Sequence, residues 1–354
     1  MAITMGINDV RRTEFTPTSA YLNTASCCLL PRRASEAVGA LVAGLGEGRP
    51  GGAGDFEAVD EARASFARLV GVDPGRVATG ASVATHVGLI AASLPPGAEV
   101  LLPEGEFASV VNPFVVRGDL RPRYVPLESL AEAVRPGTAL VAFSAVQSAD
   151  GRTADLAAVR EAAAAHGART LVDATQAVGW LPFDAGLYDY TVTGAYKWLL
   201  CPRGTQFLTV SEAAQEALIP LHGGWLAAAD TWNSTYGPLT ELAPDARRFD
   251  EGPAFLAYHG AAAALAVLEE AGVEAVHAHD TALAARYRAG LSELGHVPVP
   301  GTSPIVAVPG LGGRQPELAR AKVITSARAG HLRASFHLYN TEADVDRLLD
   351  VLSG

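Results

Sequence analysis

The stretch "RTLVDATQAVGW" (residues 169–180) is followed by "YTVTGAYKWLLCPRG" (residues 190–204), and these two stretches decide the fold. Each begins with a short, mostly apolar run, as in strands that are buried on both faces. The first run ends at Asp173, and Lys197 closely follows the second. Because chemistry in an open α/β sheet collects at the carboxyl ends of its strands, we expect Asp173 and Lys197 at the same rim.

Similar apolar runs occur elsewhere and alternate with helical patterns. The runs "EVLLPEG" (99–105), "TALVAFSAV" (138–146) and "TQFLTV" (205–210) suit buried strands. The helical patterns "FEAVDEARASFARLVG" (56–71) and "DLAAVREAAAAHG" (155–167) both stop at a glycine. This alternation predicts βα units around a mainly parallel sheet.

The pattern changes after about Trp225, where a loop rich in Gly, Asn and Pro leads into the strongly helical stretch 258–272. In the tail, Thr341 and Asp344 have the spacing of a capping pair at the start of a last helix. We therefore predict a large domain over residues 15–235 and a small C-terminal domain over residues 236–354. Residues 1–14 are predicted to pack on the small domain.

Composition limits the classes of partner. The chain has 354 residues and a formal net charge of −11, with no basic cluster, which disfavours nucleic acid as a ligand. No apolar run reaches the roughly 18 residues of a membrane helix, and the N-terminus lacks the apolar core of a signal peptide. These features predict a cytoplasmic protein that does not enter a membrane and that acts on a small molecule.

Three cysteines, Cys27, Cys28 and Cys201, have neither metal-ligand spacing nor the pattern of a disulfide framework. We predict reduced thiols and no bound metal. As small buried hydrophobic residues they need no catalytic role, although a catalytic role is the alternative.

Lys197 is one of only two lysines; the other is Lys322. A lysine at a sheet rim can form a Schiff base with an aldehyde, and an aspartate can pair with a protonated ring nitrogen. A pyridoxal 5'-phosphate (PLP) site requires both groups. The alternative is a surface lysine and an unrelated aspartate at a strand end.

The pattern of Asp, Gln three residues later, Gly three further on, and then a lysine before Trp-Leu and Pro-x-Gly resembles the class V aminotransferases of PLP fold type I. This group holds cysteine desulfurases, isopenicillin N epimerase-like proteins, kynureninases and the C-S lyase of ergothioneine biosynthesis. The resemblance implies a mainly parallel seven-stranded sheet flanked by helices, with a smaller α+β C-terminal domain. It also implies that Lys197 bonds covalently to PLP, Asp173 holds the pyridine nitrogen and Gln176 contacts the phenolic oxygen.

Other stretches fit the same resemblance. "VATGASVATHVGL" (77–89) contains a glycine turn before a helix, where backbone amides bind anions, so the cofactor phosphate is expected there; alone, the turn is equally typical of a plain helix cap. Phe107 matches the ring that stacks on the pyridine, although alone it would suit a core. Further cofactor contacts are implied for Tyr196 and Gln147. The phosphate is assigned to Gly80, Ala81 and Ser82.

The substrate contacts implied by the resemblance lie near the two ends of the chain. In "LRAS" (332–335), Arg333 is the residue whose guanidinium would bind the α-carboxylate through two parallel hydrogen bonds. Asn23 and Ala25 belong to "NTAS" (23–26), which resembles the N-terminal loop at the edge of the site. His337 belongs to the family's closing pattern, where we interpret it as structural.

Two departures from the family pattern affect the function. The segment before Arg333, "AKVITSARAGH" (321–331), contains no cysteine, so the nucleophilic thiol of a cysteine desulfurase is missing. Gly252 is followed by Pro253 where relatives have a threonine that reaches the partner subunit's phosphate, and proline offers neither hydroxyl nor amide. A homodimer is still implied by the resemblance.

The leading hypothesis is a PLP-dependent β-elimination, a C-S lyase reaction on a cysteine conjugate or related amino acid, with a role in secondary metabolism. Transamination is the nearest alternative, and epimerisation uses the same apparatus. A non-catalytic protein that kept the fold is the rival from another class, but it would be expected to lose Lys197, Asp173 or Arg333, and all three are present.

Overall fold

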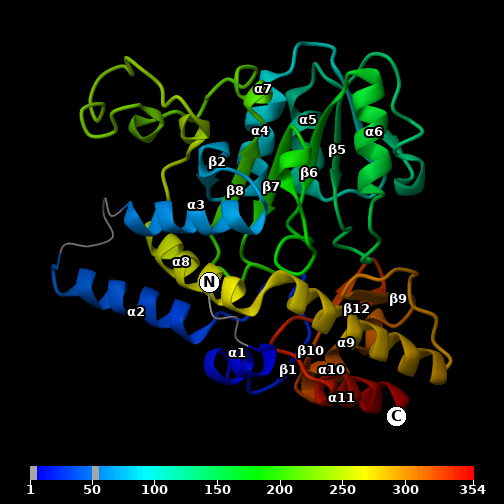
Figure 1. The fold of residues 1–354 in the computed structure, drawn as a ribbon. Coiled ribbons are helices and arrows are strands. Elements are labelled where there is room, and N and C mark those ends of the chain that lie inside the picture. Colours follow the sequence, from blue (N-terminus) through cyan, green and yellow to red (C-terminus); the bar gives the residue numbers. More distant parts are fainter. Residues whose placement is uncertain (1–5, 50–55) are drawn as a thin grey trace.

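The computed structural model describes residues 6–49 and 56–354, and its main feature is a seven-stranded sheet (Figure 1). The strand order is β2-β8-β7-β6-β5-β3-β4; β8 is antiparallel to both of its neighbours, and all other adjacent pairs are parallel. The predicted mainly parallel sheet is therefore confirmed. Its strands are β2 (Val77–Gly80), β3 (Glu99–Pro103), β4 (Arg121–Val125), β5 (Thr138–Ser144), β6 (Arg169–Asp173), β7 (Tyr190–Gly194) and β8 (Gln206–Val210).

Helices cover both faces of the sheet. On one face α4 (Val83–Ser93) and α5 (Ala108–Arg117) share an apolar core with the strands. On the other face the core is shared with α3 (Glu57–Leu69), α6 (Leu156–His166) and α8 (Phe255–Ala271). Burial on both faces explains why the strands β3 and β5 to β8 are visible in the sequence as nearly continuous apolar runs.

The edge strand β4 was not indicated by the sequence. Its residues "RPRYV" include two arginines and a proline, and none of them is fully buried. Such a composition is typical of an edge strand, where unpaired backbone groups face solvent and charge discourages pairing with other chains.

The C-terminal part has its own apolar core and its own small sheets. Strands β11 (Ser326–Arg328), β12 (His331–Ser335) and β9 (Ile305–Val308) form an antiparallel sheet, and β1 (Ala20–Tyr21) pairs in parallel with β10 (Val323–Ile324). Helices α9 (Val273–Glu293), α10 (Gln315–Arg320) and α11 (Glu342–Ser353) pack around them (Figure 1). Thr341 and Asp344 form the predicted capping box of α11.

The division at residue 236 stays a prediction. Helix α8 follows it in sequence but packs against α3 and against α2 (Arg32–Gly46), and its apolar residues belong to the core under the large sheet. The described part of the N-terminal segment, α1 (Ile7–Glu14), contacts α2, α8 and α9.

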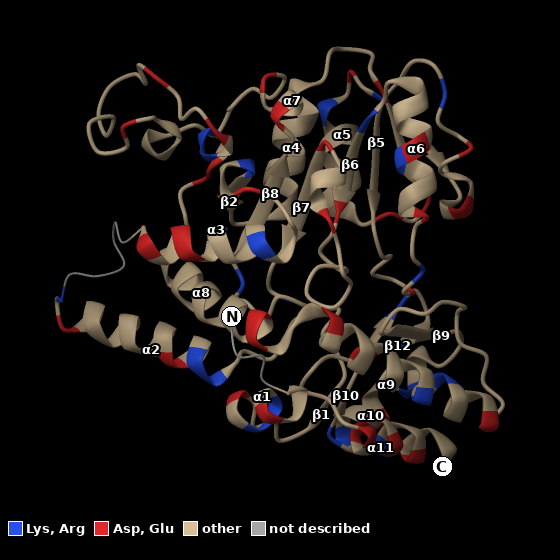
Figure 2. Ribbon diagram, in the orientation of Figure 1, with Lys and Arg blue, Asp and Glu red and all other residues tan. Residues whose placement is uncertain are grey.

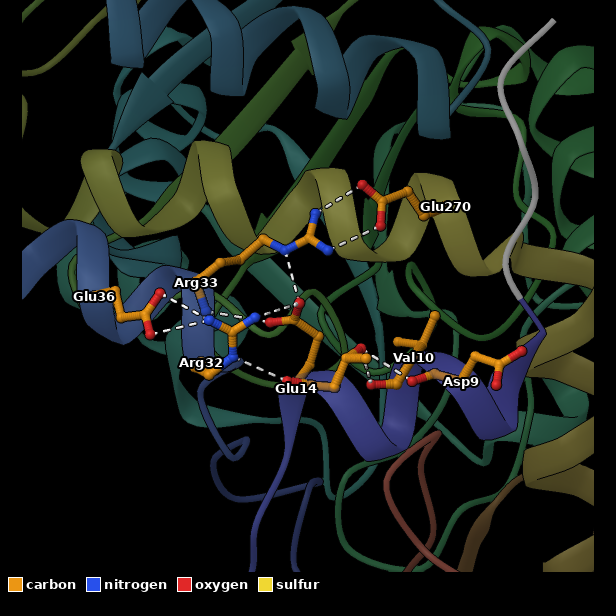
Figure 3. Close-up of polar contacts among 8 residues, drawn as sticks. Asp9, Val10, Glu14, Arg32, Arg33, Glu36 and Glu270 are labelled. Carbon is orange, nitrogen blue, oxygen red and sulfur yellow. Dashed lines mark hydrogen bonds and ion pairs between the residues drawn. The ribbon is translucent and has the colours of Figure 1, made fainter.

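An ionic group around the buried Glu14 fixes α1 to its neighbours (Figure 3). The Glu14 side chain is almost fully buried and accepts a hydrogen bond from Arg33 Nε at 2.9 Å. Arg33 also bonds both carboxylate oxygens of Glu270 on α8, at 2.7 and 2.9 Å. One guanidinium therefore joins α1, α2 and α8.

Charged residues of both signs are interspersed over the helices (Figure 2). Among the described residues, no helix is long and apolar enough to cross a membrane.

A second buried ion pair supports the strand that leads to the predicted phosphate turn. Arg63 of α3 donates to both oxygens of Asp250, at 3.1 and 2.7 Å, and to the carbonyl of Val77 at 2.6 Å. Asp250 Oδ1 also accepts from the amide of Thr79 at 2.7 Å. This arrangement ties α3 to β2 and to the segment before α8.

Replacing Arg63 by methionine is expected to lower the free energy of unfolding by about 3 to 5 kcal/mol, because it leaves the buried Asp250 carboxylate without its counter-charge. Urea denaturation of the purified variant measures this loss. The matched control is Arg68→Met on the same helix, whose side chain is 60% exposed in its ion pair with Glu269, and which should cost about 1 kcal/mol or less. Equal losses for the two variants would contradict the assignment.

Candidate active site

A cavity lies at the carboxyl ends of β6 and β7, where the sequence places Asp173 and Lys197. One glycine makes this arrangement possible: Gly179 has φ +111°, and a Cβ there would lie 2.3 Å from the carbonyl oxygen of Trp198. The turn after β6 can therefore pack directly on the loop that carries Lys197. The cavity is lined by Ala81, Ser82, Val83, Phe107, Ser109, Ser144, Ser148, Asp173, Thr175, Gln176, Gly194, Tyr196, Lys197, Arg203, Gly204 and Gln206.

Lys197 and Asp173 are both buried, and each affects the charge of the other. Burial raises the pKa of Asp173 to about 6, although a hydrogen bond from the Thr175 amide at 2.8 Å opposes the shift. Burial also lowers the pKa of Lys197 to about 8, against the attraction of Asp173. Desolvation thus outweighs their mutual attraction, and among the described residues no cation fully compensates the Asp173 carboxylate.

Two aromatic rings lie beside the amine of Lys197. The Nζ atom is 5.5 Å from the ring centre of Phe107 and 5.6 Å from that of Tyr196. The Phe107 side chain is not part of the core: the residue is 44% exposed, and it lines the cavity. A flat apolar surface is therefore available for a heterocycle.

Gln176 lies in the cavity wall and is held from both sides. Its Nε2 donates to the carbonyl of Ala25 at 2.9 Å, and its Oε1 accepts from the indole of Trp198 at 2.7 Å. The second amide hydrogen remains available for the phenolic oxygen of a cofactor. Ala25 therefore acts on the cavity through Gln176, and its predicted contact with substrate stays a prediction.

Asn23 pairs with Ser335 as an isolated bridge, and its Oδ1 is a buried acceptor for which no described residue supplies a donor. It does not line the cavity, so its predicted contact with substrate also stays a prediction.

The predicted phosphate turn has an unexpected feature. The amide of Gly80 donates to the Tyr258 hydroxyl at 3.0 Å, and the amide of Ala81 donates to a carboxylate oxygen of Glu251 at 2.9 Å. Protein groups thus use two of the amides that the resemblance assigns to phosphate. Ser82 caps α4 with its hydroxyl, and Ser82 and Val83 line the cavity at the helix start.

The sequence did not indicate the role of Glu106. This buried carboxylate accepts from the Ser144 hydroxyl at 2.6 Å, from Gln147 Nε2 at 2.9 Å and from the Phe107 amide at 2.6 Å. Glu106 thereby fixes both the backbone of Phe107, the predicted stacking residue, and the side chain of Gln147. The Gln147 side chain points to Glu106 and does not line the cavity, whereas the next residue, Ser148, does. The feature of the sequence that could have indicated this role is an acidic residue directly before Phe107, the predicted stacking residue.

Arg333 lies on β12, beside the cavity. Its guanidinium donates to the hydroxyls of Ser326 at 3.1 Å and Ser26 at 2.6 Å, and to the carbonyl of Ser148. Among the described residues it has no carboxylate partner. Burial, with repulsion from Arg328, lowers the pKa of Arg333 to about 10. A buried cation with neutral partners only is well suited to bind a substrate carboxylate.

The three cysteines are free. Cys28 and Cys201 are buried as predicted, but Cys27 is only partly buried, so the prediction is wrong for that residue. A hydrogen bond from Cys28, followed by the attraction of Arg203, lowers the pKa of Cys27 to about 6.

His337 supports the lysine loop from behind. It is fully buried, bonds Asp280 through Nδ1 at 2.8 Å and bonds the carbonyl of Trp198 through Nε2 at 3.0 Å. These contacts agree with its structural interpretation.

The fold and the site together define an α/β enzyme of PLP fold type I. Residues 54–311 match the family described as aminotransferase class-V, and the chain belongs to that family. An uncharacterized aminotransferase, YcbU of Bacillus subtilis, is 27% identical over 325 residues, which cover 84% of each chain. Isopenicillin N epimerase of Streptomyces clavuligerus is 34% identical over 256 residues, covering 62% of this chain and 63% of that one.

Solved structures show the same fold. The cystine C-S lyase C-DES in complex with its reaction product cysteine persulfide matches with a TM-score of 0.85 at 24% identity, covering 95% of this chain and 97% of that one. The apo cysteine desulfurase from Thermococcus onnurineus NA1 matches with a TM-score of 0.85 at 20% identity, covering 100% and 98% of the two chains. The predicted fold type, enzyme class and PLP cofactor are thus confirmed.

The residues of the cavity fit this cofactor. Asp173 is a buried acid whose raised pKa indicates a missing cation, and a protonated pyridine nitrogen would supply one. Phe107 offers its ring, and Ser82 and the start of α4 offer an anion site. The Glu251 carboxylate on the Ala81 amide and the Tyr258 hydroxyl on the Gly80 amide compete with phosphate at this turn.

Proposed function

We propose that the chain is a PLP-dependent C-S lyase that removes the β-substituent of a cysteine conjugate or related amino acid. The observation that carries the proposal is the placement of Lys197 and Asp173 in one cavity, beside the uncompensated guanidinium of Arg333. When bound, PLP supplies an electron-withdrawing ring that makes the α-proton of an amino acid acidic.

Four residues of this chain would have separate roles in the proposed reaction. Arg333 binds the α-carboxylate and so orients the Cα–H bond. Lys197 accepts the α-proton at Nζ, and its pKa of about 8 suits a base near neutral pH. Asp173, ionised against the ring nitrogen, maintains the positive charge that draws electrons from Cα. Phe107 excludes water from one face and transfers no proton.

The elimination step breaks two bonds of the amino acid, Cβ–S and Cα–H. The Cβ–S bond breaks, the sulfur leaves with the electron pair and is protonated to a thiol, and the α-proton is lost. Hydrolysis of the remaining three-carbon fragment gives pyruvate and ammonium. No protein thiol is required, which agrees with the absence of cysteine from residues 321–331.

Transamination is the second candidate, because the relative YcbU, which is described as an aminotransferase, matches along 84% of the chain. Epimerisation is less well supported. The ring of Phe107 lies 5.5 Å from Lys197 Nζ and offers no acid for protonation at Cα.

Incubation of the purified enzyme with a cysteine S-conjugate is expected to release pyruvate, ammonium and thiol in equal amounts. Lactate dehydrogenase coupling measures the pyruvate, and a thiol reagent measures the thiol. The matched control is alanine, which has no β-leaving group and should give no pyruvate in the absence of an added 2-oxo acid. Conversion of the cofactor to its amine form, without release of thiol, would reject elimination in favour of transamination.

The homodimer, the cytoplasmic location and the role in secondary metabolism are part of this proposal. Their support is the family resemblance. Many relatives have a threonine at the position of Pro253 that reaches the phosphate of the partner subunit, so this contact would differ in a dimer of this chain.

A further inference from the structure

Three arginines lie close enough to Lys197 to help lower the pKa of its amine: Arg203 on the loop after it, Arg328 on β11 and Arg333 on β12. All three repel the protonated amine. Arg328 and Arg333 share one neutral acceptor, the Ser26 hydroxyl, at 3.3 and 2.6 Å. The guanidinium carbon of Arg203 lies 4.6 Å from the ring centre of Tyr196, and Arg203 lines the cavity.

These three arginines lack the carboxylate partner that several other arginines of the described chain have. Arg32, Arg68, Arg286 and Arg314 each hold a carboxylate at 3.0 Å or less. Within the described residues, Arg203, Arg328 and Arg333 hold none. Such a local excess of positive charge, in a chain of net charge −11, costs stability unless a ligand brings anions.

The acids near the cavity do not supply that charge. Asp173 is bonded to Thr175 and faces the expected ring nitrogen. Glu106 is engaged by Ser144, Gln147 and Phe107, and Glu251 accepts from the Ala81 amide. The acidic group beside Arg203 is the Cys27 thiol, and a single sulfur cannot match the two parallel donors of a guanidinium as a carboxylate does.

The anions of cofactor and substrate can be assigned to separate places. The phosphate belongs with Ser82 and the start of α4, and the α-carboxylate belongs with Arg333. Arg203 interacts instead with Tyr21 of β1, with Cys27 between β1 and α2, and with Tyr196. One exposed cation at the cavity therefore remains without an anion.

We propose that Arg203 binds a second carboxylate, carried by the β-substituent of the substrate, with Arg328 adding to the positive potential at the entrance. The substrate class is then a cysteine conjugate whose sulfur bears an acidic group. This inference rests on the proposed elimination reaction for its substrate class, but the charge preference can be measured independently.

The test compares two nearly isosteric conjugates, S-(2-carboxyethyl)cysteine and its neutral amide S-(2-carbamoylethyl)cysteine. A charged hydrogen bond contributes about 1.5 to 3 kcal/mol, so kcat/KM should favour the acid by about 10- to 150-fold. Arg203→Gln should reduce this ratio to about 1, mainly by raising KM for the acid. Arg121→Gln, on the edge strand β4 far along the sheet from β7, is the matched control and should keep the ratio.

Two further measurements separate the possible failures. The absorbance change of the holoenzyme gives the dissociation constant of each conjugate, and this reports the charge preference even if no thiol is released. Tighter binding of the acid than of the amide, without thiol release, would reject the proposed function but not the role of Arg203. Titration with PLP tests whether Arg203 binds the cofactor phosphate instead. If Arg203→Gln weakens PLP binding and affects both conjugates equally, Arg203 binds the phosphate and the inference is wrong. Equal affinity of the wild-type enzyme for acid and amide would also overturn it.

Discussion

Replacing Lys197 by arginine is expected to reduce elimination by at least about 10⁴-fold, because the side chain would lose both its covalent bond to the cofactor and its role as base. A guanidinium keeps the positive charge but remains protonated at every working pH. No other lysine lines the cavity beside Asp173, so no described residue can take over. Thiol release from a cysteine S-conjugate measures the loss.

Lys322→Arg is the matched control, since Lys322 is the only other lysine and is exposed near β10. It should retain the wild-type rate. A Lys197→Arg enzyme with activity within an order of magnitude of the wild type would contradict the assignment of Lys197 as the catalytic base.

Replacing Asp173 by asparagine is expected to have opposite effects on activity and on stability. Loss of the carboxylate removes the charge that keeps the ring nitrogen protonated, and a lost electrostatic contact of this kind reduces the rate by about 10²- to 10³-fold. The apoenzyme, by contrast, should become more stable at pH 7. Burial raises the pKa of Asp173 from 3.8 to about 6, so ionisation of this group opposes folding.

The direction of the stability difference between variant and wild type, and the pH range in which it develops, follow from the raised pKa of Asp173. The carboxyl of the unfolded chain loses its proton near pH 4, whereas that of the folded wild type keeps its proton up to about pH 6. Variant and wild type should therefore be nearly equally stable at pH 4, the wild type should lose stability between about pH 4 and pH 6, and the full cost of about 3 kcal/mol should be present at pH 7. Urea denaturation of the two apoenzymes at pH 4 and pH 7 measures the difference.

Asp119→Asn is the control for this comparison, because that carboxylate is 44% exposed in its ion pair with Arg117 and should change stability by about 1 kcal/mol or less at both pH values. Addition of PLP should stabilise the wild type more than Asp173→Asn. An apo variant less stable than the wild type at pH 7 would contradict the view that Asp173 is an uncompensated buried acid.

The elements that sequence reasoning located are those whose local pattern carries the information. Asp173 and Lys197 were found because each follows an apolar run, and runs buried on both faces are conspicuous. The capping box at Thr341 was found because its signal spans only four residues. The edge strand β4 escaped because its exposed arginines and its proline do not resemble a buried strand.

The contacts that sequence reasoning missed join segments far apart in the chain. Glu106 meets Ser144 and Gln147 only because β3 and β5 are neighbours in the sheet. Ser26 reaches Arg333 across more than 300 residues, and Glu251 reaches the amide of Ala81 across 170. No spacing within one segment predicts such pairs, because they depend on how the strands are ordered and how the C-terminal part folds back.

Borohydride reduction of the PLP-loaded enzyme, followed by peptide mass analysis, tests the central claim most directly, because the chain offers only two lysines. Lys197 and Asp173 share one buried cavity, so we predict that the reduced cofactor is found on the peptide containing Lys197, and that Lys322 is unmodified. A cofactor fixed on Lys322, or an active enzyme whose Lys197 peptide carries no added mass, would contradict the account.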